Sequence, residues 1–127
     1  MKFKTFITIH ATVLAFVGLG TLFIAPTLMG SYGLRVEEHG IILARMLGSL
    51  MIANAVLSWL FRDVTEPRAL MAIVYQQLVA WILTLTVSFI AQLDGAYLPI
   101  GWSNIVLYVI FSYAWVHYGF IKPIAKQ

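Results

Sequence analysis

The sequence predicts an all-α protein, a four-helix transmembrane bundle. Four apolar runs of about 20 residues follow one another, and all five acidic residues lie outside them. Of the 127 residues, 61% are hydrophobic and 10% are charged, whereas soluble domains average about 25% charged. So few charges cannot cover a water-soluble surface, and about 20 apolar residues span the hydrocarbon core of a bilayer as one helix. We expect a single integral membrane domain over residues 1–127.

The runs predict helices at about residues 5–25, 41–61, 69–91 and 101–121. Short connections make neighbouring helices antiparallel, which gives an up-down-up-down bundle. The connection 26–40 mixes apolar and charged residues, and we expect it along the outer interface. Each proline lies at the border of a run, where a ring without an N–H is tolerated best: Pro26, Pro67, Pro99 and Pro123.

The first run has the outline of a secretory signal peptide, because Lys2 and Lys4 precede it. We expect it to be retained as a helix, since it is longer than the apolar core of a typical signal peptide. Small residues at spacings of three and four share one face of this helix and predict the close approach of a neighbour: Thr8, Ala11, Ala15 and Gly18.

Basic residues predict the orientation, because an excess of lysine and arginine marks the cytoplasmic side. In the up-down topology, Arg35 lies on one side, where Arg45 could join it. The other basic residues share the opposite side: Lys2, Lys4, Arg62, Arg68, Lys122 and Lys126. We therefore expect both termini to be cytoplasmic and the protein to be a multi-pass protein of the cell inner membrane. The net charge of +3 is spread over helix ends and does not indicate a nucleic-acid partner.

The second run carries Arg45, the only formal charge inside a run, close to Gly48. Arg45 would lie roughly 7 Å below the outer boundary, at helical rise. At this depth the side chain can reach the interface. Glu38 and Asp94 are the expected ion-pair partners, which would tie the outer connections to the bundle. An anion or lipid-headgroup site is the alternative interpretation.

Asn54 lies on the opposite face from Arg45, because nine residues make about 180° around an α-helix. In a hairpin of the second and third helices, Asn54 is level with Gln76 and Gln77. A buried amide contact between these helices is expected, worth about 0.6–2 kcal/mol in a membrane. Polar positions continue from Gln77 along the third helix. They are expected to make hydrogen bonds between helices, and a narrow, uncharged solute path is the alternative.

His10 and His117 are each expected about 7–10 Å inside the cytoplasmic boundary. Two histidines at one depth could bind haem axially, and one could ligate the magnesium of a chlorophyll-type pigment. A hydrogen bond from an interfacial histidine to a tyrosine or headgroup is the simpler interpretation, so no cofactor is predicted. The sequence has no cysteine, which leaves no disulfide, thiolate metal site or covalent c-type haem. No metal site is predicted.

Between Gly18 and Trp59 the chain reads GLGTLFIAPTLMGSYGL and then LARMLGSLMIANAVLSW. This stretch resembles a pattern shared by small uncharacterised bacterial four-helix inner-membrane proteins, over about a third of the chain. The matching motifs are Ala25-Pro26, Gly33-Leu34 and Ala44-Arg45-Met46-Leu47-Gly48. The resemblance implies a topology and no activity. Small multidrug transporters are similar in size, but they depend on a glutamate inside the first helix, which this chain lacks.

The expected function is that of a non-catalytic accessory or assembly subunit, packed against a larger membrane complex such as a bioenergetic one. Its expected partners are the lipid bilayer and a membrane protein or further copies of the chain. One alternative is a pigment- or haem-binding subunit that uses His10, His117 or both. Another is a small binding or transport protein for a lipid or neutral solute, with Arg45 and the polar positions of the third helix as its site. An enzyme is not expected, because no carboxylate dyad or nucleophile–base pair stands out in the predicted helices.

Overall fold

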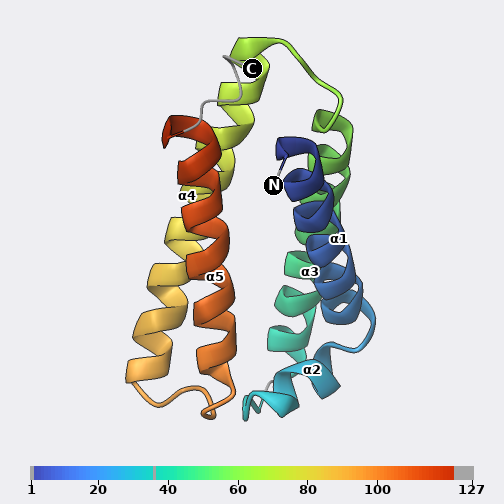
Figure 1. Cartoon of the computed structure of the whole chain (residues 1–127). Helices are drawn as coiled ribbons and strands as arrows, with labels where there is room; N and C mark the ends of the chain where they lie inside the picture. Colours follow the sequence, from blue (N-terminus) through green and yellow to red (C-terminus); the bar gives the residue numbers. More distant parts are fainter. Residues whose placement is uncertain (1, 36, 122–127) are drawn as a thin grey trace. The chain divides into compact units, whose positions relative to one another are not determined.

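The computed structural model describes residues 2–35 and 37–121, and within them the chain is helical without a strand. Its elements are α1 (Phe3–Phe23), α2 (Ala25–Ser31), α3 (Glu38–Phe61), α4 (Pro67–Leu93), α5 (Gly101–Val116) and the π-helical turn η1 (His117–Ile121) (Figure 1). The all-α fold class is therefore confirmed. The predicted positions of Lys122, Pro123 and Lys126 lie outside the described residues.

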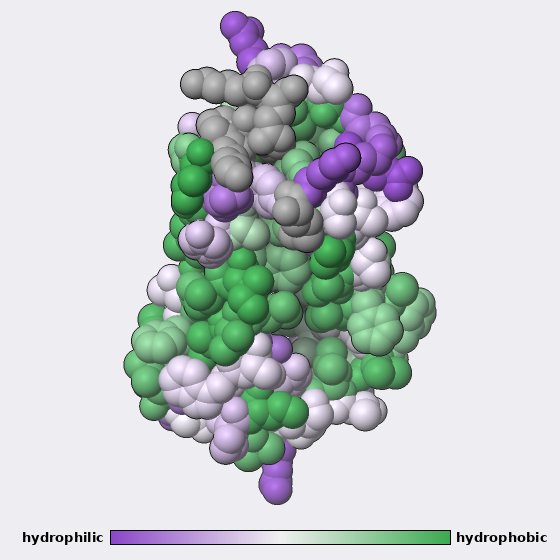
Figure 2. All heavy atoms as spheres, viewed as in Figure 1, coloured by the Kyte–Doolittle hydropathy of each residue, from purple (hydrophilic) through white to green (hydrophobic). Residues whose placement is uncertain are grey.

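In the part of the chain that the structure describes, four helical segments are long and apolar enough to cross a membrane: Phe3–Phe23, Glu38–Phe61, Pro67–Leu93 and Gly101–Ile121. The chain is accordingly a multi-pass membrane protein. On the face drawn in Figure 2, apolar residues cover the middle of the helices and hydrophilic residues gather toward their ends. The side on which the termini emerge stays a prediction.

The helices differ from the predicted runs mainly at their ends. Three of them extend past the predicted runs, with α1 beginning at Phe3, α3 beginning at Glu38 and α4 running from Pro67 to Leu93. A helix can continue into the polar interface, so apolarity marks its membrane part better than its full length. The predicted interfacial connection also contains a short helix, α2, in which Pro26 occupies the first turn. Proline fits there because the first N–H groups of a helix have no intrahelical acceptor.

Glycine ends both α2 and α4, at the two positions among the described residues where the backbone has a positive φ. Gly33 has φ 83° and Gly95 has φ 74°, a conformation that glycine adopts without steric strain. After Gly95, the N–H of Ala96 donates to the carbonyl of Ala91 at 2.9 Å. An equivalent bond follows Gly33. Both ends are Schellman turns, and the Gly33-Leu34 motif of the sequence is one of them.

The chain divides into two compact units, Met1–Arg62 and Asp63–Gln127, and each is described by itself. In the first unit α1 and α3 are antiparallel, because His10 meets Ser58 while Gly18 meets Gly48. A Cβ added at Gly48 would lie 2.8 Å from the carbonyl oxygen of Gly18. Glycine at this position therefore permits the two backbones to touch.

In the second unit, rings fill the contact between α4 and the segment formed by α5 and η1. Trp81 stacks on Phe111 with ring centroids 5.0 Å apart, and Tyr108 lies 5.5 Å from Trp81 on another side. Two further ring pairs follow along the same antiparallel contact: Phe89–Trp102 and Tyr75–Phe120. Aromatic packing thus holds this helix pair together.

Candidate functional site

The most enclosed polar pair of the first unit joins His10 of α1 to Ser58 of α3. The Nδ1 atom of His10 lies 3.2 Å from the hydroxyl of Ser58, and both residues are 0% exposed. The ring of Phe6 covers the imidazole with a centroid distance of 6.1 Å. His10 follows Ile7 and precedes Leu14 on the buried face of α1, which directs its side chain toward α3.

A hydroxyl beside an imidazole is the pairing that nucleophilic enzymes use. Here the two side chains are fully enclosed, so the pair provides an interhelical hydrogen bond, of a kind that stabilises helix contacts in membranes. A flat macrocycle on His10 would have to displace this packing. Nothing in the spacing or composition around Ser58 distinguishes it, although an antiparallel register that pairs Gly18 with Gly48 brings it close to His10.

His117 lies half-buried in the π turn at the end of α5. Its ring stands nearly perpendicular to that of Tyr118 at 5.3 Å and lies 6.2 Å from the ring of Tyr113. This aromatic surrounding is typical of a histidine at a membrane interface. Within residues 2–35 and 37–121, no three histidine, aspartate or glutamate side chains come together as a metal site. His10 and His117 belong to different units, so a ligand shared by both stays a prediction.

Arg45 is exposed on α3, seven residues after Glu38, which is also exposed. In the described part of the first unit, no ion pair joins these two side chains. The hydroxyl of Ser49 donates to the backbone carbonyl of Arg45 at 3.0 Å, so Ser49 bonds within its own helix. Gly48 is buried against α1. Arg45 and Gly48 therefore lie on different faces of α3, one exposed and the other in the helix contact. The pairing of Arg45 with Asp94 of the second unit stays a prediction.

The three amide residues have different surroundings. Asn54 is half-buried in α3, Gln76 is exposed on α4, and Gln77 is 2% exposed. Asn54 belongs to the first unit and the two glutamines belong to the second. The predicted contact between them therefore stays a prediction. Trp81, one turn after Gln77, is buried in the ring stack. Within the second unit, the buried residue one turn after Gln77 on α4 is therefore part of the aromatic core.

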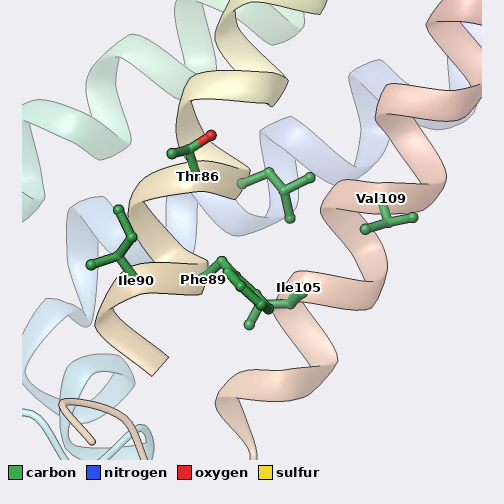
Figure 3. Close-up of a pocket in the computed structure, with 6 residues that line it drawn as sticks. Thr86, Phe89, Ile90, Ile105 and Val109 are labelled. Atoms are coloured by element: carbon green, nitrogen blue, oxygen red, sulfur yellow. The ribbon is translucent and has the colours of Figure 1, made fainter. Parts of the chain in front are cut away.

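Each helix pair carries a surface groove. The α1–α3 groove has a volume of about 330 Å³ and is lined by Ala11, Thr12, Ala15, Ile52, Ala55, Val56 and Trp59. The α4–α5 groove has a volume of about 350 Å³ and is lined by Leu85, Thr86, Phe89, Ile90, Ile105 and Val109. In Figure 3, Thr86, Phe89 and Ile90 project from α4 on one side of it, and Ile105 and Val109 from α5 on the other.

The two threonines do not make these grooves polar. The hydroxyl of Thr12 donates to the carbonyl of Thr8 at 2.9 Å, and that of Thr86 donates to the carbonyl of Ile82 at 2.8 Å. Because each hydroxyl is bonded within its own helix, both grooves present apolar surface. Such surface suits an acyl chain or the side chains of another helix.

Comparisons of the chain with protein-family models, with curated proteins and with solved structures found no match.

Proposed function

We propose that the protein is a non-catalytic accessory subunit that packs, through its membrane-spanning helices, against another membrane protein. The observation that carries this proposal is the exposed guanidinium of Arg45 within α3. Seven residues separate Arg45 from Glu38, or about 10 Å along the helix axis. Charged side chains inside a spanning segment usually face protein or a water-filled cavity, and a partner subunit would provide such surroundings.

The low burial of α3 supports the same function. Of the most apolar 18-residue stretch of α3, 11% is buried, against 39% of that of α1. Large apolar side chains such as Leu43, Met46 and Leu50 are exposed along it. Lipid can cover such side chains as well as protein can. A protein neighbour is favoured because these exposed apolar side chains lie on the same helix as Arg45.

The polar pair of the first unit also supports a structural role. His10 and Ser58 are enclosed, so their arrangement suits a fixed helix contact better than a reaction with a substrate. The apolar grooves likewise fit association. The enclosed pair and the apolar grooves thus fit an accessory subunit, which needs no accessible nucleophile or base.

The test is purification of the tagged full-length chain from native membranes in a mild detergent. We expect a second membrane polypeptide to co-purify in a fixed molar ratio, measured by native mass spectrometry. A chain that is recovered alone at every detergent strength would contradict the proposal. The absorption spectrum of the same sample serves as a second readout: a visible band removed by His117→Ala would favour the pigment or haem alternative instead.

A further inference from the structure

Arg45 lies in line with the α1–α3 groove. On α3, the positions Arg45, Ser49, Ile52, Val56 and Trp59 follow steps of four and three residues, which keeps them on one face of an α-helix. The last three line the groove. Val56 is 55% exposed and Trp59 is 45% exposed, so this face is accessible. The groove and the guanidinium therefore form one continuous surface, here named the Arg45 surface.

The shape of the Arg45 surface suits a helix. Alanines form much of the groove, with Ala11 and Ala15 one turn apart on α1 and Ala55 on α3. Small residues one turn apart let another helix approach closely in a membrane. Trp59 at one end supplies a large side chain, with the guanidinium of Arg62 3.8 Å from its ring centroid on one face. A third helix could lay a ridge of side chains between α1 and α3, as in ridges-into-grooves packing.

The charge of the surface specifies its occupant. A guanidinium in a medium of low dielectric constant is stabilised most by a carboxylate in a bidentate pair. A second copy of the chain docked by the same face about a twofold axis would bring two Arg45 side chains to the same depth, where like charges repel. The charge therefore favours a different protein with an acidic residue.

We propose that the Arg45 surface binds a transmembrane helix of a partner protein, and that this helix carries an aspartate or glutamate level with Arg45. The inference rests on the proposed function and deepens it by naming the face and the chemistry of the partner. The competing occupant is a lipid whose phosphate pairs with Arg45 and whose acyl chain fills the groove. Lysine can replace arginine in a phosphate contact more readily than in a bidentate carboxylate pair, which separates the two.

The first experiment is photo-cross-linking of the full-length chain in native membranes, with a benzophenone amino acid at position 56. The matched control places the same amino acid at position 50, where Leu50 is 64% exposed and lies about 120° away around α3. We expect position 56 to cross-link the partner and position 50 not to. A product of twice the chain mass, a link within one chain, or a link from position 50 alone would overturn the inference.

The second experiment measures co-purification of the partner with Arg45→Lys and Arg45→Glu. We expect Arg45→Glu to lose at least about tenfold of the bound partner, because reversing one member of a buried charge pair weakens binding strongly. We expect a smaller but measurable loss for Arg45→Lys, because lysine keeps the charge and lacks the bidentate geometry. Arg68→Glu, at the exposed start of α4, is the control for charge reversal. Thermal unfolding of each variant confirms that it folds.

These outcomes separate a failure of the inference from a failure of the proposed function. If Arg45→Lys retains the partner fully, the Arg45 surface does not bind a carboxylate and the lipid occupant is favoured. If a partner co-purifies but is cross-linked only from other faces, the inference fails while the proposed function stands. If no partner co-purifies with the unmodified chain, the proposed function itself fails.

Discussion

The two helix pairs of this chain reach tight packing by opposite means. The α1–α3 pair removes side chains from its contact, with glycine against glycine at Gly18 and Gly48. The α4–α5 pair fills its contact with rings, led by Trp81 on Phe111. Lipid tails are as apolar as leucine, so burying apolar area does not by itself drive helices together in a bilayer. What remains is close contact, which either very small or large interlocking side chains can provide.

The pairs also differ in what a single substitution removes. In the glycine contact, any added atom forces two backbones apart, whereas in the aromatic contact a smaller side chain loses its ring contacts with the neighbouring side chains. We therefore expect the first pair to be sensitive to enlargement and the second to truncation.

The largest effect is expected for Gly48→Val. The added Cβ would lie 2.7 Å from the backbone nitrogen of Leu22, so α1 and α3 must separate. Overpacking of this kind lowers the free energy of unfolding by about 3 kcal/mol, to be measured by denaturation in mixed micelles. Gly30→Val is the matched control, because a Cβ at Gly30 meets nothing within 4 Å. Equal effects of the two substitutions would contradict the glycine contact.

A smaller effect is expected for Trp81→Leu. The substitution keeps an apolar side chain but removes the ring contacts with Phe111 and Tyr108, and aromatic pairs contribute about 0.5–1.5 kcal/mol each. We expect the free energy of unfolding to fall by about 1–2 kcal/mol. Trp102→Leu is the control, since Trp102 is 44% exposed and makes one edge contact with Phe89. A larger loss at Trp102 would show that the stack is not the centre of this pair.

The smallest effect is the coupling between His10 and Ser58. A double-mutant cycle with His10→Leu and Ser58→Ala should give an interaction energy of about 1 kcal/mol, the range found for hydrogen bonds between membrane helices. As a control, His10→Leu combined with Ser49→Ala should be additive, because the Ser49 hydroxyl bonds to its own helix backbone. An additive result for His10 and Ser58 would mean that their contact contributes nothing measurable to stability.

Much of the fold could be predicted from the sequence, because apolar runs of bilayer length leave few alternatives. The Gly33-Leu34 motif entered only through a family resemblance, and the structure shows that it forms a Schellman turn. The close face of α1 was also marked in advance by its small residues, of which Gly18 makes the predicted contact. These features depend on local spacing, which a sequence displays directly.

The candidate site was harder to predict, since it depends on register between distant segments. Ser58 resembles any other serine in a membrane helix until α1 and α3 are aligned at Gly18 and Gly48. The spacing around Arg45 likewise does not show that Gly48 is buried while Arg45, three residues earlier, is exposed. A few tens of degrees around a helix separate these outcomes, and hydrophobicity varies too little around α3 to fix them.

The contact of Gly18 with Gly48 has a consequence for the temperature response of the protein. In water, association through apolar surface weakens on cooling, because its driving force comes from the solvent. Two glycine backbones that meet inside a bilayer gain their attraction from dispersion between closely fitted atoms, which does not fade in the cold. The first helix pair is therefore built to stay closed in a chilled membrane, where a water-soluble helix pair of the same size would begin to loosen.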